Sequence, residues 1–176
     1  MKTLIIGGSG SGKSELAEQI CLSHGGILTY IATMQPYGPE AQKRIERHHA
    51  LRAGKGFNTV ECYHNLDQQT GISQGTVLLE CLGNLVANEF FSGNSIDVTA
   101  EQKIYSGIEM LEHASDNLVI VTNDIFADGM LYDHEMQQYL QLLGNINAVI
   151  AQRFDQVIEV VCGLSIWHKG AKHDSI

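Results

Sequence analysis

Short apolar runs and longer amphipathic segments alternate along the whole chain. The runs Val77–Cys81 and Leu118–Thr122 are largely apolar, which is typical of strands buried on both faces of a parallel sheet. The segment Gly12–Ser23 instead places Leu16 and Ile20 four residues apart, on one face of a helix. Strands that alternate with helices in this way predict a three-layer α/β domain, with helices on both faces of a mainly parallel sheet.

The same pattern gives bounds for each element. We predict strands at Leu4–Gly7, Ile27–Thr33, Phe57–Glu61, Val77–Cys81, Leu118–Thr122 and Gln156–Val161. We predict helices at Gly12–Ser23, Glu40–Leu51, Thr99–His113 and Asp133–Gln152. No internal repeat or low-complexity linker divides the 176 residues, so we expect a single domain over residues 1–176.

Charge and composition narrow the classes of function. The chain carries 11 Lys+Arg against 20 Asp+Glu, a net charge of −9, and its longest basic block is the pair Lys43-Arg44. Nucleic-acid affinity depends on many basic contacts with phosphates, so we expect no nucleic-acid partner. The N-terminal apolar run ends at Gly7-Gly8, too short for a signal peptide or a membrane span. We therefore expect a cytoplasmic protein.

The cysteines offer no metal or redox motif. Cys21, Cys62, Cys81 and Cys162 lie far apart, and no two of them form a C-x-x-C pair. Unpaired cysteine is usually buried in folded proteins, so we expect free, buried thiols.

A glycine-rich segment follows the first predicted strand. It reads Gly7-Gly8-Ser9-Gly10-Ser11-Gly12-Lys13-Ser14, which matches G-x-x-x-x-G-K-[ST], and it opens the first predicted helix. Glycines let backbone N–H groups converge on a phosphate, and the helix N-terminus adds partial positive charge. We expect Lys13 to reach the β- and γ-phosphates of ATP or GTP, and Ser14 to hold Mg²⁺. A dinucleotide fingerprint does not fit, because G-x-G-x-x-G from Gly8 would need glycine at position 13.

Polar residues end two of the apolar strands. Glu80 follows Val77-Leu78-Leu79, and Asn123-Asp124 follows the strand that ends at Thr122. Ligands of open parallel sheets bind at the carboxyl ends of the strands. We therefore predict that Glu80 holds Mg²⁺ or positions a water molecule, with a solvated turn residue as the alternative.

The second predicted helix concentrates positive charge in an acidic chain. Residues 44–52 include three arginines and two histidines. Arg44, His48 and Arg52 follow one another at intervals of four residues and share one stripe, whereas His49 is expected to point elsewhere. Arginine binds phosphate in a bidentate way and histidine acts as a nucleophile, so the stripe fits a phosphate site. A solvated, charged helix is the alternative.

These segments together resemble the bifunctional adenosylcobinamide kinase/adenosylcobinamide-phosphate guanylyltransferases of cobalamin assembly. The segments that fit the family's patterns are Gly7–Ser14, Tyr30–Thr33, Arg44–Arg52, Phe57–Glu61, Leu78–Cys81, Val121–Asp124 and Gly144–Asn147. The phosphate loop alone is generic, but its combination with Y-I-A-T and R-I-x-x-H-x-x-x-R is specific. The match spans nearly the whole chain.

The resemblance implies two reactions at one site. In the first, ATP or GTP phosphorylates the aminopropanol hydroxyl of adenosylcobinamide; in the second, GMP passes from GTP to the product through a guanylyl-histidine. The resemblance implies that His48 is the nucleophile. Lys13, Ser14 and Mg²⁺ would then orient the triphosphate, while Arg44 and Arg52 stabilise the developing charge. It also implies a homotrimer, in which the second helix meets a neighbouring subunit.

The resemblance further implies a set of nucleotide contacts beyond the phosphate loop. These are Ala32, Thr33, Met34, His49, Ala50, Leu51, Arg52, Glu61 and Glu80. The segments Ile125–Asp133 and Gln137–Gln141 depart from the family's pattern, and Phe57 stands where tryptophan is usual. Two alternatives therefore stay open: a diverged P-loop kinase of another small molecule, and a non-catalytic GTP-binding protein.

Overall fold

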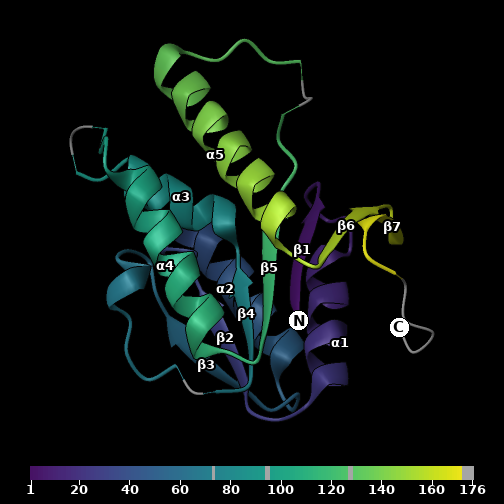
Figure 1. Cartoon of the computed structure of the whole chain (residues 1–176). Coiled ribbons are helices and arrows are strands. Elements are labelled where there is room, and N and C mark those ends of the chain that lie inside the picture. The colour runs from purple at the N-terminus through teal and green to yellow at the C-terminus, as the bar shows by residue number, and fades with distance from the viewer. Residues whose placement is uncertain (73, 94–95, 127–128, 172–176) are drawn as a thin grey trace.

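The computed structural model describes residues 1–72, 74–93, 96–126 and 129–171, and the side chain of Leu51 lies outside this description (Figure 1). The strands are β1 (Lys2–Gly7), β2 (Leu28–Ala32), β3 (Phe57–Glu61), β4 (Thr76–Glu80), β5 (Asn117–Asn123), β6 (Gln156–Val161) and β7 (Leu164–Lys169). The helices are α1 (Lys13–His24), α2 (Gly38–Arg52), α3 (Leu82–Phe90), α4 (Ala100–Ala114) and α5 (His134–Arg153), with a short 3₁₀ helix, η1 (Leu66–Gln68).

Every predicted element is confirmed within about two residues, but α3 and β7 were not predicted. Only Cys81 separates β4 from α3, so no turn or loop segment marks the change from strand to helix in the sequence. β7 follows β6 through a tight turn at Cys162-Gly163, where both residues have positive φ angles. The prediction therefore missed the one antiparallel pair of the described sheet, β6 with β7.

The sheet has seven strands in the order β3-β2-β4-β5-β1-β6-β7, and the pairs from β3 to β6 are all parallel. β1 pairs with β5 on one side and with β6 on the other. The carboxyl ends of β1, β2 and β4 thus share one edge, with the loop after β1 beside them. Ligands bind at this edge in open parallel sheets.

Alternate residues of the central strands enter two hydrophobic cores. Val77 and Leu79 pack with residues of α3, α4 and α5 on one face of the sheet. Leu78 and Val119 pack on the other face, against Ala17 and other residues of α1. The side chains of a strand alternate between faces, so each central strand is buried on both sides. The predicted three-layer α/β architecture is confirmed.

α2 differs from the other helices because it has no apolar face. Neither hydrophobic core contains a described side chain from α2. Of the α2 side chains that the structure describes, Arg52 is the one that is buried. Pro39 stands in its first turn, where the missing N–H costs no hydrogen bond. α2 instead contacts the sheet through Arg52, which lies over the Tyr30 ring, and through His48, which lies beside Glu80.

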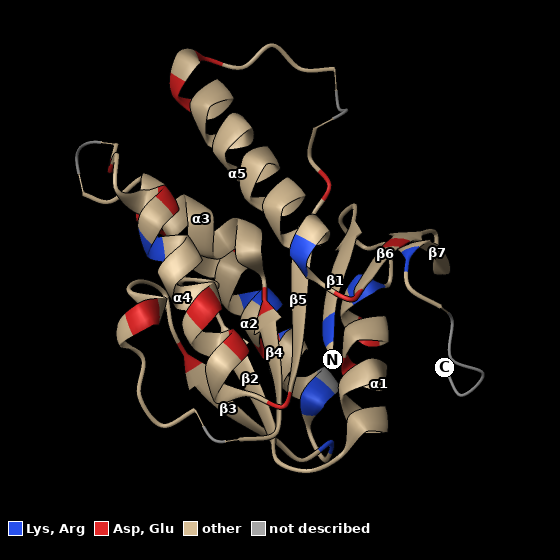
Figure 2. Cartoon of the chain, in the orientation of Figure 1, with Lys and Arg blue, Asp and Glu red and all other residues tan. Residues whose placement is uncertain are grey.

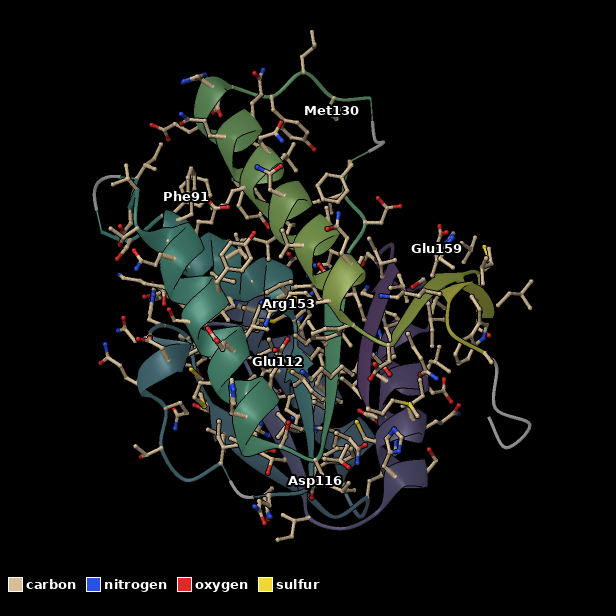
Figure 3. The ribbon with its side chains drawn as sticks, viewed as in Figure 1. Phe91, Glu112, Asp116, Met130, Arg153 and Glu159 are labelled. Carbon is tan, nitrogen blue, oxygen red and sulfur yellow. The ribbon has the colours of Figure 1, made fainter. Side chains whose placement is uncertain are left out.

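α5 is the longest helix of the described chain and is almost free of charge. Its charged residues are Glu135, in the first turn, and Arg153, in the last turn, and Figure 2 shows the helix in tan between its two ends. Arg153 Nη2 donates a hydrogen bond of 2.6 Å to Glu112 Oε2 and so joins the end of α5 to α4 (Figure 3). Neither α5 nor any other described helix is both long and apolar enough to cross a membrane.

The cysteines differ from one another in burial. Cys21, Cys62 and Cys81 are free and buried, as predicted. The prediction is wrong for Cys162, which is free and exposed. Its position in the turn between β6 and β7 explains this, because turns of a hairpin project into solvent.

Candidate functional site

A cavity of about 790 Å³ lies where the strands end at the carboxyl edge of the sheet. Its walls are the loop after β1, one side of α2 and the ends of β2, β4 and β5. The predicted phosphate loop and the predicted Arg/His helix therefore face the same space. A cavity of this size accommodates a nucleotide-sized ligand.

The loop after β1 has the conformation that its glycines permit. Gly10 and Gly12 have φ angles of 71° and 97°, which favour glycine. Gly7 is also confined, because a Cβ there would lie 2.6 Å from the Val160 carbonyl oxygen. Gly12 caps α1, so the free N–H groups of the first helical turn point toward the cavity side of the loop.

Lys13 and Ser14 start α1 at the floor of the cavity. Lys13 is buried, and its Nζ donates to the Gly8 carbonyl oxygen at 2.9 Å. Burial lowers the pKa of Lys13, and the neighbouring Cys81 and Glu80 oppose this shift. Such a lysine gains a stronger partner when phosphate oxygens enter the loop.

Glu80, at the end of β4, contacts three other side chains of the site. The Ser14 hydroxyl donates to its Oε1, and the Tyr30 hydroxyl donates to its Oε2 at 3.1 Å. His48 Nδ1 lies 4.0 Å from Glu80 Oε1. Glu80 is buried and lines the cavity, so the alternative of a solvated turn residue does not hold.

The Ser14–Glu80 pair also suits Mg²⁺. Magnesium in nucleotide sites is usually held by one or two protein oxygens together with phosphate oxygens and water, and not by an all-protein cage. A hydroxyl and a carboxylate side by side supply this donor set. Within the described residues no cluster of three or more His, Cys, Asp or Glu side chains forms a metal site of its own.

α2 presents a broad face to the cavity. Arg44, Arg47, His48, His49 and Arg52 all line it. The prediction that Arg44, His48 and Arg52 share one face is confirmed, whereas the prediction that His49 points elsewhere is wrong. α2 does not pack into the hydrophobic cores, so the cavity extends around more of its surface than one stripe.

Arg52 is the most buried of these cations. It is 6% exposed, and its Cζ lies 3.5 Å from the centroid of the Tyr30 ring. Its Nε and Nη1 are buried and have no hydrogen-bond partner. A buried guanidinium in this state favours an anionic ligand.

The other residues predicted to bind nucleotide divide into two groups. Ala32, Met34 and Glu61 line the cavity with Ser9 to Ser14. Thr33 instead is fully buried, and its hydroxyl bonds to the backbone N–H and carbonyl oxygen of Cys81, each at 2.8 Å. Gly7, Gly8 and Ala50 do not line the cavity, and the side chain of Leu51 lies outside the described part.

Several cavity residues were not predicted. These are Glu15, Glu18, Tyr30, Ile45, Arg47, Lys55, Tyr63, Cys81, Asn84, Asn123 and Ile125. For Tyr30 the sequence held a signal, because Tyr30 and Ala32 are two apart in a strand and therefore share a face. For Lys55 and Tyr63 it held none, since they lie in connections whose path depends on the fold.

A glycine-rich loop, a Lys-Ser pair at a helix start and a carboxylate on a neighbouring strand define a P-loop nucleotide-binding protein. Comparison with known proteins identifies one family within this class. Residues 3–167 match the family described as cobinamide kinase / cobinamide phosphate guanyltransferase. The chain belongs to this family, and it is accordingly a transferase with the kinase and nucleotidyltransferase chemistry that the family's description gives.

Two curated relatives match over nearly their full length. The bifunctional adenosylcobalamin biosynthesis protein CobU of Salmonella typhimurium is 29% identical, with 94% of this chain and 98% of the relative covered. The bifunctional adenosylcobalamin biosynthesis protein CobP of Pseudomonas aeruginosa is 27% identical, with 97% and 98% covered. Among solved structures, the flagellar accessory protein FlaH from Methanocaldococcus jannaschii has a TM-score of 0.49 at 12% identity, covering 98% of this chain and 81% of that one.

Proposed function

We propose that this protein phosphorylates adenosylcobinamide and then converts the product to adenosylcobinamide-GDP with GMP from GTP, through a guanylyl-His48 intermediate. The family and its two bifunctional relatives support the pair of activities. One observation supports the guanylyl-His48 intermediate: His48 shares a cavity with the phosphate loop, and its Nδ1 lies 4.0 Å from Glu80 Oε1.

In the phosphoryl transfer, the chain's task is to hold the triphosphate and neutralise its charge. The N–H groups of residues 9–14 surround the phosphates, and Lys13 exchanges its Gly8 partner for phosphate oxygens. Ser14 and Glu80 would hold Mg²⁺, which would supply positive charge that neutralises the triphosphate. The acceptor hydroxyl attacks the γ-phosphorus, the bond to the bridging oxygen breaks and the nucleoside diphosphate leaves.

In the guanylyl transfer, the orientation of the imidazole decides which nitrogen reacts. Nδ1 faces the carboxylate of Glu80, so Nε2 is the nitrogen left to attack. Nε2 bonds to the α-phosphorus of GTP and pyrophosphate leaves. An oxygen of adenosylcobinamide phosphate then attacks the same phosphorus, and the P–N bond breaks to free the imidazole. Arg44 and Arg52, on the same face of α2, stabilise the charge on the phosphate oxygens.

Labelling with GTP tests the intermediate. GTP carrying ³²P at the α-position, with Mg²⁺, is expected to label the protein with an acid-labile, base-stable bond, as a phosphoramidate requires. His48→Ala is expected to abolish the label, because it removes the imidazole whose Nδ1 lies beside Glu80. His49→Ala is expected to keep the label, and His113→Ala, on the distant surface of α4, serves as the matched control.

Three outcomes contradict the proposal. A label that persists in His48→Ala places the covalent bond on another residue. Turnover of GTP with adenosylcobinamide and no label in the wild type instead indicates a P-loop kinase whose α2 only binds acceptor phosphate. GTP binding that is lost in Lys13→Ala, without any corrinoid product, indicates a non-catalytic protein.

We also propose that the active form is a homotrimer in the cytoplasm. The family resemblance supports the trimer, and so do exposed apolar side chains before α5. Phe126, Met130 and Leu131 are 44%, 66% and 101% exposed. Contact between subunits would cover such side chains.

A further inference from the structure

Tyr30 occupies a central position between two charged groups of the site. It lies in the middle of β2, is 3% exposed and lines the cavity. Its hydroxyl donates to Glu80 Oε2 at 3.1 Å, and its ring lies 3.5 Å from Arg52 Cζ. The Phe57 ring packs edge-on against it, with 6.3 Å between the centroids.

The hydroxyl bond to Glu80 determines how that carboxylate is turned. Oε2 is held by Tyr30, so Oε1 is the oxygen that faces Ser14 and His48. A carboxylate without the Tyr30 donor is free to rotate, and then the oxygen that faces the imidazole is no longer fixed.

The ring contact determines where Arg52 lies. Arg52 is the one buried side chain among the described residues of α2, and no hydrogen bond to its Nε or Nη1 is present. Its guanidinium therefore depends on the face of the Tyr30 ring for its position, as cation–π pairs do. The two unpartnered nitrogens remain available to an anion that enters the cavity.

We propose that Tyr30 is a positioning residue with two separable roles: its hydroxyl orients Glu80 for the reaction of His48, and its ring holds Arg52 for binding GTP. This inference rests on the proposed function for its first role. The second role requires only that GTP binds in this cavity.

Two substitutions separate the roles. Tyr30→Phe removes the hydroxyl and keeps the ring, whereas Tyr30→Leu removes both. We expect Tyr30→Phe to lower the rate of His48 labelling at saturating GTP by about tenfold, the size of a lost hydrogen bond to a charged group, with GTP affinity within about twofold of wild type. We expect Tyr30→Leu to show the same rate loss and, in addition, a GTP affinity weakened by about threefold to tenfold.

A mutant cycle with Arg52 distinguishes positioning from general destabilisation. Equilibrium dialysis measures GTP affinity in Arg52→Ala and in Arg52→Ala with Tyr30→Leu. If the ring acts through Arg52, Tyr30→Leu has no further effect on affinity once Arg52 is absent. Additive losses in the cycle overturn the role of the ring.

Tyr139→Phe is the matched control for the hydroxyl. Tyr139 is also buried, and its hydroxyl donates at 3.1 Å to the Gly83 carbonyl oxygen outside the cavity. Thermal unfolding of both variants reports the cost in stability. A Tyr30→Phe protein that loses stability like Tyr139→Phe but labels at the wild-type rate overturns the role of the hydroxyl. If the wild type is not labelled, the proposed function fails, the hydroxyl role fails with it, and dialysis still decides the role of the ring.

Discussion

Three buried cysteine thiols make the free energy of unfolding of this protein depend on pH. Burial raises the pKa of Cys62 and of Cys81 from 9.0 to about 11, and it raises the pKa of Cys21 further. As pH rises through this range, the unfolded chain releases thiol protons while the folded chain keeps them. The unfolded state then binds fewer protons, so the free energy of unfolding must fall with increasing pH.

We expect the free energy of unfolding to fall between pH 9.0, the ordinary thiol pKa, and pH of about 11, the pKa of Cys62 and Cys81 in the folded chain. Each thiol contributes at most about 1.4 kcal/mol per pH unit. Urea unfolding from pH 8 to 10.5, about the range over which these thiols titrate, measures the slope. Cys62→Ala is expected to reduce the slope of the free energy of unfolding against pH by the contribution of one thiol. Cys162→Ser, at an exposed site, is expected to leave this slope unchanged. Equal slopes in Cys62→Ala and wild type would contradict the argument.

Several residues that line the cavity were predictable from sequence, but their contacts were not. The motif predicts Lys13 and Ser14, and the helical interval of four predicts the shared face of Arg44 and His48. Thr33 was predicted to bind nucleotide, yet it bonds to the Cys81 backbone, because side-chain direction depends on the neighbouring strand.

Helix α4 approaches η1 unusually closely, and a glycine makes the approach possible. A Cβ added at Gly107 would lie 2.8 Å from Leu66 Cβ and 3.0 Å from Leu66 Cγ. Both Leu66 and the side chains around it are buried in the larger hydrophobic core, so there is little room for adjustment. Gly144 in α5 is different, because its nearest contact for a Cβ is Phe126 Cε1 at 3.7 Å.

The same substitution is therefore expected to have opposite effects in the two helices. Gly107→Ala should destabilise the protein by about 1–3 kcal/mol through overpacking. Gly144→Ala should stabilise it by about 0.5–1 kcal/mol, because alanine is the better helix former and the site has room. Urea midpoints of the two variants and wild type measure both effects. A stabilised Gly107→Ala protein would show that Leu66 moves away without cost.

Helices and strands were predicted correctly where the hydrophobic period and the length of the segment indicated the same type of element, as in α4 and α5. α2 was predicted although it has no apolar face, because Pro39 marks its start and its residues favour helix. α3 was missed because a single residue, Cys81, separates it from β4 and no turn residues mark its start, although Leu82, Leu85 and Val86 have helical spacing.

For the whole molecule, the alternation of elements was sufficient to predict the architecture but not the order of the strands. The observed order places β1 between β5 and β6, and β4 between β2 and β5. This order brings Glu80 of β4 beside Ser14 across a separation of 66 residues. Such a contact depends on long-range packing, which no local pattern in the sequence encodes.

Exposed apolar side chains gather in the segment before α5, which predicts that this segment contacts another subunit. The segment before α5 exposes Phe126, Met130 and Leu131, and Figure 1 shows the start of α5 standing away from the sheet. In a monomer this surface would remain in water, at a cost of about 25 cal/mol per Å² of apolar area. Burial between subunits removes that cost, and the proposed trimer provides the partners.

Light scattering coupled to gel filtration is expected to give a mass near three times the 19.3 kDa of the chain. Leu131→Glu is expected to shift the protein toward monomer, because a charge in the covered surface leaves a buried, unpaired carboxylate. Leu22→Glu is the matched control: Leu22 is 42% exposed and belongs to α1, which packs on the opposite face of the sheet from α5. A monomeric wild type would contradict the trimer, and a trimeric Leu131→Glu protein would place the subunit contact on a different surface.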